Sequence, residues 1–239
     1  MGLIDWWQAL WRGGSASLTP KWRGRKWHDV PLLAVDLELT SLDTAKAEVT
    51  SIGWVEGKVG ELELNSCFYE VVKTDKSLEQ SPVIHGLTAE DIDAGTNVED
   101  VLDTLRPFAE SHVWVLHNAT LDLGVLGKLF DRHNMPVAEI LTLDTLKLAV
   151  YQLKKQHDVL PPNSATLTVC RQRLNLPAAP AHNALDDAVA TMQLWFAQFY
   201  DMNGDNETLI DDFLHTQAIA MKKITKKCKQ DVDKTTDSA

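Results

Sequence analysis

The sequence predicts an α/β domain built on a mixed, five-stranded sheet flanked by helices. Three consecutive strand-like segments open the core region, and short apolar runs then alternate with segments of helical periodicity. That order is typical of a sheet with both antiparallel and parallel pairs. The composition agrees, because 44% hydrophobic and 24% charged residues in a chain of 239 are ordinary for a globular protein with one sizeable core.

The predicted strands are short apolar or alternating runs. The first is a buried run that leads directly into Asp36, the third mixes apolar and polar residues as in a sheet with one wetter face, and the last two are brief and largely apolar. Their predicted ranges are 32–35, 48–55, 61–72, 113–116 and 140–143. The predicted helices show apolar side chains at a spacing of three and four residues. Their ranges are 98–109, 121–130, 144–153, 165–174, 183–200 and 207–227.

The two ends of the chain differ from its centre. Residues 1–28 form a Trp-rich extension, in which 3–12 has the pattern of an amphipathic helix with a narrow polar stripe. Such a helix can dock on its own domain, on a partner such as a DNA polymerase, or at a membrane surface. We assign 29–204 to the core domain, and 205–239 to a C-terminal helix followed by a polar tail.

Bulk properties limit the location and the partners. No apolar run approaches the ~20 residues of a membrane span, and no secretory signal pattern is present. Three scattered cysteines favour reduced thiols in the cytoplasm and argue against structural zinc. The net charge of −11 argues against a protein that coats long nucleic acid, since such proteins are usually basic.

Acidic residues recur in three apolar islands of the chain. Asp36 and Glu38 are two residues apart at a strand end, so both carboxylates point to one face. Asp122 falls in the first turn of a predicted helix, and Asp187 lies about one turn after His182 at the start of another. Carboxylates that converge bind divalent metal ions, and such ions cleave phosphodiesters.

Each of these residues also has a plainer interpretation. Asp36 and Glu38 can be surface charges, Asp122 can interact with a helix dipole, and His182 can cap a helix. The adjacent Asp186 points about 100° away from Asp187 on an α-helix. We therefore prefer Asp187 as a ligand.

The order of the islands is more specific than any one of them. Val-Asp-Leu-Glu-Leu-Thr at 35–40, His-Asn-Ala-Thr-Leu-Asp at 117–122 and His-Asn-Ala-Leu-Asp-Asp-Ala at 182–188 resemble the three motifs of the DEDDh 3′–5′ exonucleases. This family includes the proofreading epsilon subunit of bacterial DNA polymerase III, RNase T and oligoribonuclease. The segments 83–88 and 143–146 also resemble family segments. The resemblance covers about residues 31–200.

The resemblance implies a ribonuclease-H-like fold and two Mg²⁺ or Mn²⁺ ions. It implies that Asp36, Glu38 and Asp187 hold the ion that carries the attacking water. Asp36 would bridge to a second ion, which Asp122 would contact. His182 would be the general base. The catalytic set is thus His182, Asp36, Glu38, Asp122 and Asp187, of which the four acids are the metal ligands.

Substrate-binding candidates lie beside these acids. They are Leu39, Thr40, His85 and Asn118, and for His85 a loop histidine that closes a turn is the competing interpretation. Leu39 and Ser41 stand where the family often has Thr and Gly, and Leu121 stands where an aromatic is frequent. None of the five catalytic positions departs from the family pattern.

The expected function follows from the resemblance. We expect a metal-dependent 3′–5′ exonuclease that acts on 3′ ends of single-stranded or frayed DNA and releases nucleoside monophosphates, in proofreading or repair. An RNA-trimming or short-oligonucleotide enzyme is the close alternative, and the acidic net charge fits short substrates somewhat better. A polymerase- or membrane-associated interaction subunit, which binds through the N-terminal helix, is the alternative of another class. A catalytically silent interaction domain is disfavoured by the intact acids and histidine.

Overall fold

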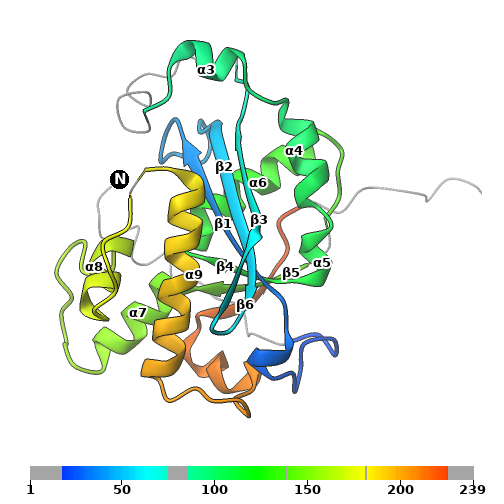
Figure 1. The fold of residues 1–239 in the computed structure, drawn as a ribbon. Coiled ribbons are helices and arrows are strands. Elements are labelled where there is room, and N and C mark those ends of the chain that lie inside the picture. Colours follow the sequence, from blue (N-terminus) through cyan, green and yellow to red (C-terminus); the bar gives the residue numbers. More distant parts are fainter. Residues whose placement is uncertain (1–17, 75–85, 138, 181, 226–239) are drawn as a thin grey trace, which may run out of the picture.

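The computed structural model describes residues 18–74, 86–137, 139–180 and 182–225, which form a mixed six-stranded sheet with helices on both faces (Figure 1). The strand order is β3-β2-β1-β4-β5-β6. β1 pairs in parallel with β4, and β4 with β5, whereas the other pairs are antiparallel. The strands are β1 (Leu32–Leu39), β2 (Val49–Lys58), β3 (Glu61–Val71), β4 (Val113–Leu116), β5 (Ile140–Asp144) and β6 (Ile219–Lys222).

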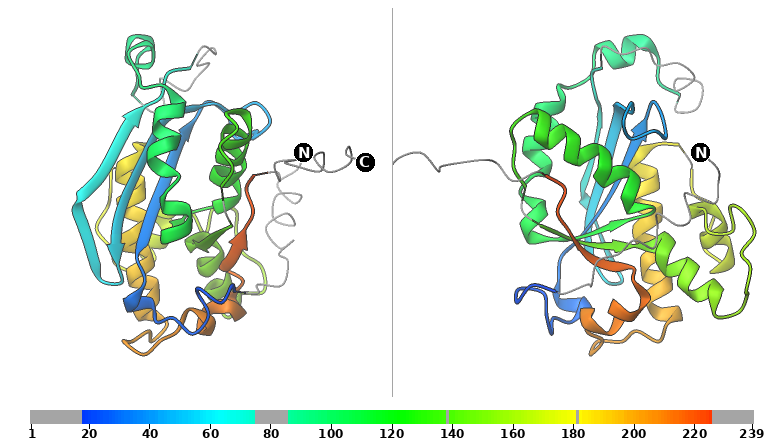
Figure 2. Two further views of the ribbon diagram at one scale, coloured as in Figure 1. Left: turned by 90° about the vertical axis from the view of Figure 1, so that its right-hand side faces the viewer. Right: turned by 180° about the vertical axis from the view of Figure 1, so that it is seen from behind.

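Helices cover the sheet from two sides, as the turned views show (Figure 2). The cluster formed with α4 and α6 fills one side, and α9 packs on the other against β1 and β2. The helices are α3 (Ala89–Asp93), α4 (Val98–Leu105), α5 (Phe108–Ser111), α6 (Ala119–Arg132), α7 (Thr145–Lys154), α8 (Leu167–Arg173) and α9 (Ala184–Asp201), with the 3₁₀ turns η1 (Trp27–Asp29) and η2 (Ile210–Thr216).

Strand β1 supplies side chains to both halves of the core. Leu33 and Val35 belong to the cluster with α4 and α6, whereas Leu32 and Ala34 belong to the cluster with α9. Because side chains alternate along a strand, Asp36 continues the row that faces α9. The apolar alternation that buries β1 thus also decides on which side of the sheet its carboxylates emerge.

The predicted helix over 207–227 is wrong. The structure has η2 there, followed by the strand β6, and β6 pairs with the edge of β5 through partners such as Leu143 and Ile219. Gln217 adopts a left-handed conformation (φ 60°) that ends the helical turn before the strand. Since an open edge leaves backbone groups unpaired, adding a strand to β5 satisfies them. The sheet therefore has six strands where the sequence predicted five.

Two smaller differences concern the helices. The predicted helix over 98–109 is divided into α4 and α5 at Pro107, whose ring does not fit the interior of a helix. The short helix α3 was not predicted. Thr88 begins it with a reciprocal capping box, in which the Thr88 hydroxyl accepts from the backbone of Asp91 while the Asp91 carboxylate accepts from the backbone of Thr88.

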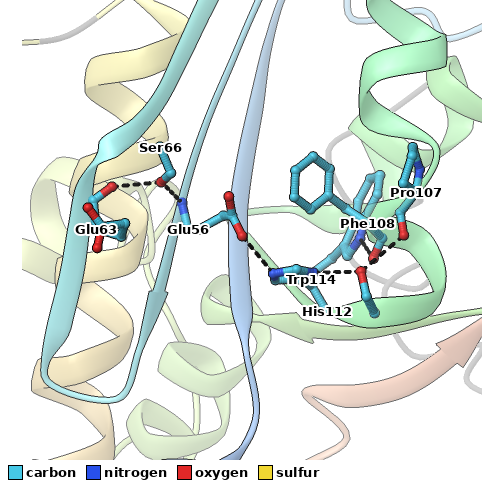
Figure 3. Close-up of polar contacts among 8 residues, drawn as sticks. Glu56, Glu63, Ser66, Pro107, Phe108, His112 and Trp114 are labelled. Atoms are coloured by element: carbon cyan, nitrogen blue, oxygen red, sulfur yellow. Dashed lines mark hydrogen bonds and ion pairs between the residues drawn. The ribbon is translucent and has the colours of Figure 1, made fainter.

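A polar contact joins β2 to the turn between α5 and β4 (Figure 3). The Glu56 Oε2 lies 2.9 Å from Nε2 of His112, and the other ring nitrogen lies 2.8 Å from the Ser111 hydroxyl. That hydroxyl in turn donates to the Pro107 carbonyl at 3.0 Å. Burial lowers the pKa of His112, although the Glu56 carboxylate opposes the shift. This series of polar contacts connects α5 to the antiparallel half of the sheet.

The N-terminal side of the described chain packs into the core. Leu18, Trp22 and Trp27 are buried in the core cluster that includes α9, and the ring centroids of Trp27 and Trp195 are 4.7 Å apart. The helix predicted over 3–12 lies outside the described residues. Among the residues that are described, no helix is long and apolar enough to cross a membrane.

Candidate active site

Three of the predicted acids meet at one point of the molecule. Asp36 and Glu38 project from β1, and Asp187 projects from the first turn of α9. One carboxylate oxygen from each lies within 4.8 Å of the others. Such oxygens are hard ligands that suit Mg²⁺ or Mn²⁺, so the donor set fits a divalent ion.

Asp122 is the fourth acid at this place. It lies buried in the first turn of α6. Its negative charge raises the pKa of Asp36, and the negative charge of Glu38 raises the pKa of Asp122. Burial, with smaller contributions from Asp144 and Glu38, raises the pKa of Asp122 to about 8. The four acids predicted from separate islands therefore interact across one site.

Burial and the negative charges of their neighbours raise the pKa values of these carboxylates. Burial raises the pKa of Asp36 well above its ordinary value, and Asp122, Asp187 and Glu38 each add to the rise. Burial and then Asp187 raise the pKa of Glu38 to about 7. The cause is the cost of holding several negative charges away from water without a cation. A bound cation would remove that cost, which is the behaviour of a metal site.

The start of α9 is built around His182. The residue has a left-handed backbone (φ 67°), its side chain is exposed, and its backbone N–H donates to Oδ2 of Asp187 at 3.1 Å. The Asn183 side chain caps the helix by accepting from Leu185 at 3.0 Å and Asp186 at 3.3 Å. Asp187 is thereby tied to the residue that the family motif assigns as the base, and Asp186 is not part of the acidic cluster.

A glycine lets α9 approach the sheet closely. Gly53 is the partner of Asp36 in the β1–β2 ladder. A Cβ atom at Gly53 would lie 2.3 Å from the backbone nitrogen of Leu185 and 2.5 Å from the carbonyl carbon of Ala184. The first turn of α9 rests where that atom would be, which carries Asp187 to the carboxylates of β1. Our sequence analysis missed Gly53, although a glycine inside a strand is a known signal of close backbone approach.

Asp144 joins the starts of two helices. Its carboxylate accepts from the backbone N–H groups of Asn118 and Ala119 at the start of α6, both at 3.2 Å. It also accepts from Leu146 at 3.1 Å and Lys147 at 3.3 Å at the start of α7. The segment at 143–146 thus holds in place the helix that carries Asp122.

His117, in the second motif, has a structural environment. Its ring is half-buried, with Nδ1 2.9 Å from the Thr145 hydroxyl and Nε2 3.0 Å from the Ala165 carbonyl. Burial lowers the pKa of His117. Both nitrogens are engaged with neighbouring elements, so the ring connects β4 to α7 and to the segment before α8.

The candidate substrate residues have different surroundings. Leu39 is half-buried against the core, and the Thr40 hydroxyl accepts from the backbone of Glu48 at 3.1 Å. Asn118 has a left-handed backbone (φ 78°) at the start of α6. The side chain of Leu42, which our sequence analysis did not single out, is 84% exposed in the loop after β1. His85 lies outside the described residues.

Comparison with known proteins identifies the family. A family model described as an exonuclease, RNase_T, matches residues 33–195. The chain belongs to the DEDDh 3′–5′ exonuclease family. A DNA polymerase III PolC-type of Thermotoga maritima is 27% identical over 175 residues, which are 73% of this chain and 12% of that protein. The PolC-type polymerase of Streptococcus suis is 28% identical over 196 residues, 80% of this chain and 13% of that protein.

Solved exonuclease structures share the fold. Exonuclease X in complex with 5′ overhanging duplex DNA aligns with a TM-score of 0.56 and 22% identity over 75% of this chain and 98% of that one. The nuclease domain of 3′hExo, a DEDDh family member bound to rAMP, aligns with a TM-score of 0.58 and 14% identity over 74% of this chain and 95% of that one. The predicted ribonuclease-H-like α/β fold is confirmed, with the sixth strand as the difference.

Proposed function

We propose that the protein is a metal-dependent 3′–5′ exonuclease that removes nucleoside monophosphates from the 3′ ends of DNA. The observation that carries the proposal is the convergence of Asp36, Glu38 and Asp187, with Asp122 beside them. The chain spans about an eighth of the length of the PolC-type polymerases it matches, so their similarity supports DNA as the substrate without extending to the whole polymerase.

Each residue at the site has a definite role in this proposal. Asp36, Glu38 and Asp187 would hold one divalent ion, and Asp36 and Asp122 would hold a second. Bound Mg²⁺ or Mn²⁺ supplies charge stabilisation at the attacking and leaving oxygens. His182 accepts the proton of the attacking water; its side chain is exposed, and its backbone N–H donates to the Asp187 carboxylate.

One assay tests both the direction of digestion and the preference for DNA or RNA. DNA and RNA of one sequence, single-stranded or with a frayed end, are labelled at the 5′ or 3′ end and incubated with Mg²⁺ or Mn²⁺. Progressive shortening of 5′-labelled DNA and early release of a 3′-labelled monophosphate are expected. Faster hydrolysis of RNA or of very short strands would favour the alternative, which the acidic net charge and the rAMP-bound structural neighbour support.

The metal ligands are tested by substitution. We expect Mn²⁺ to raise the melting temperature of the wild type but much less that of Asp36→Ala or Asp187→Ala. Asp186→Ala is the matched control, because it removes a neighbouring carboxylate that lies outside the cluster. An equal rise in all four proteins would exclude this metal site.

The base is tested separately from the metal. His182→Ala should lose most of its turnover, by roughly 10²–10⁴-fold, and retain the stabilisation by Mn²⁺. Full turnover in His182→Ala would exclude His182 as the base.

Residues 1–17 are the candidate partner-binding segment, because the residues that follow them up to 28 pack into the core. We propose that the segment at 3–12 binds a polymerase or another protein, and that the protein works in the cytoplasm, where Cys67 and Cys170 stay reduced. Deleting residues 1–17 should leave the nuclease rate unchanged and abolish capture of that partner. Loss of activity together with unfolding would show that the segment belongs to the folded domain.

A further inference from the structure

A buried arginine lies behind the candidate active site. Arg171 is on α8, and its side chain is 4% exposed, which is rare for a charged residue. One guanidinium nitrogen donates to the Ala190 carbonyl at 2.8 Å. The other terminal nitrogen donates to the Pro177 carbonyl and to Oε1 of Gln193, both at 3.0 Å. A planar guanidinium offers several donors in fixed directions, so one side chain serves all three acceptors.

These three acceptors belong to segments that carry functional side chains. Ala190 lies on α9 one turn after Asp187, and Gln193 lies on the same helix one turn further on. Pro177 lies in the loop that leads from α8 to His182. Arg171 therefore joins α8, this loop and α9 through a single group. The loop is held near its start by Arg171 and at its end by the hydrogen bond from His182 to Asp187.

The burial of Arg171 has an electrostatic cost that apolar packing would avoid. Its hydrogen-bond acceptors are neutral carbonyl and amide oxygens, so they orient the cation without cancelling its charge. Burial lowers the pKa of Arg171, whereas the Asp187 carboxylate raises it. A leucine would fill the space at less cost but would leave the Pro177 and Ala190 carbonyls unconnected. The electrostatic cost of burying Arg171 is explained if its connection between the loop and α9 is required.

We propose that Arg171 is a positioning residue for the reaction: its guanidinium locks the loop of residues 174–180 onto α9, so that His182 and Asp187 face Asp36 and Glu38 together. This proposal rests on the proposed function for the roles of His182 and Asp187. Arg171 touches neither residue through a hydrogen bond in the structure and acts through the backbone that carries them.

The test removes the guanidinium of Arg171 and leaves that of Arg173, its neighbour on α8, in place. Arg171→Met and Arg171→Ala are compared with Arg173→Met and Arg173→Ala. Arg173 lies on the same helix but donates to the Ser164 carbonyl, outside the loop and α9. The measurements are kcat and KM with Mg²⁺ on single-stranded DNA, and backbone hydrogen exchange across residues 174–180. Each rate is taken below the melting transition, so that it reports folded enzyme.

In Arg171→Met we expect kcat to fall by roughly ten- to a hundredfold with KM little changed, because a displacement near 1 Å costs about 10² in rate. Exchange across the loop should become faster by about tenfold. Guanidinium chloride at low, non-denaturing concentration should restore part of kcat in Arg171→Ala. Tetramethylammonium chloride at equal ionic strength should not, and neither salt should change the Arg173 variants.

Unchanged kcat and loop exchange in Arg171→Met would overturn the proposal. A loss of kcat without faster exchange and without guanidinium rescue would also overturn it, since that pattern indicates general damage. If Arg171→Met does not fold, Arg171→Lys gives the decision by the same two measurements, because one ammonium cannot span all three acceptors. A wild type inactive on every nucleic acid would refute the proposed function, whereas the exchange measurement would still report on the lock.

Discussion

The close approach of α9 to the sheet at Gly53 gives the sharpest prediction. In Gly53→Ala the new Cβ would lie 2.3 Å from the backbone nitrogen of Leu185, whereas ordinary contact begins at 3.4 Å. The obstacle is backbone, which cannot rotate away as a side chain can. The first turn of α9 must therefore retreat by about 1 Å, and Asp187 moves with it away from Asp36.

The size of the effect follows from this displacement. A misplacement of about 1 Å at a reaction centre costs roughly 10² in rate, or about 2.7 kcal/mol of transition-state stabilisation. Forcing a methyl group into a packed contact costs about 1–3 kcal/mol of folding stability. We therefore expect kcat/KM of Gly53→Ala to fall about a hundredfold, and its stabilisation by Mn²⁺ to shrink, in a protein that still folds.

A matched control exists on the same strand. In Gly57→Ala the added Cβ would lie 2.4 Å from the Glu61 carbonyl oxygen, at the β2–β3 hairpin. The clash is similar but lies away from the first turn of α9, so Gly57→Ala should lose stability and keep its rate per folded molecule. The assay measures the unfolding free energy, the Mn²⁺-dependent melting shift and kcat/KM for all three proteins. Wild-type kcat/KM and melting shift in Gly53→Ala would refute the reasoning.

Three further predictions follow from the charges. Without metal, the free energy of unfolding should fall as pH rises from about 4 to 8, because the raised pKa values of Glu38 and Asp122 make the folded state hold protons that the unfolded state releases. Mn²⁺ should remove this loss of stability. A metal-free stability that stays flat or rises with pH would contradict the prediction. Asp144→Ala, which uncaps two helices, should lose about 2–4 kcal/mol in urea unfolding, and a loss under about 1 kcal/mol would show that the caps are replaced. A double-mutant cycle of His112→Ala and Glu56→Gln should give a coupling of about 0.5–3 kcal/mol, whereas zero coupling would show that this contact adds nothing.

The parts of the fold that could be predicted are those in which local pattern and burial agree. The strand predicted over 113–116 is β4 with the same bounds, since a short apolar run between polar turns has few other places to lie. The helix predicted over 183–200 is α9 within one residue at each end. Asn183 supplied a local start signal there, because its side chain caps the helix.

The segment now known as β6 shows where local pattern fails. Ile219 to Lys222 has no feature that excludes a helix, and small apolar residues favour one. The strand forms because β5 presents an unpaired edge, a fact that depends on residues about eighty positions earlier in the chain. Long-range pairing of this kind overrides propensity and is not visible in a local window.

The candidate site divides in the same way. The residues proposed to carry the chemistry were predicted from the sequence, because their types and order carry the family resemblance; they are Asp36, Glu38, Asp122, Asp187 and His182. The residues that bring them together were not. Gly53, Asp144 and Arg171 act by a missing Cβ, by bonds to two helix starts and by a buried guanidinium, and each effect exists only between distant segments.

The sequence by itself determined which atoms can meet a divalent ion and on which face of β1 two of them emerge. Alternation along a strand and rotation along a helix are local rules, and they also set Asp186 aside. Only the tertiary structure decided how near the other groups come. The spacing between β1 and α9 depends on the volume absent at Gly53, and the place of α6 depends on the carboxylate of Asp144. Packing distance is a property of surfaces in contact, which no single segment contains.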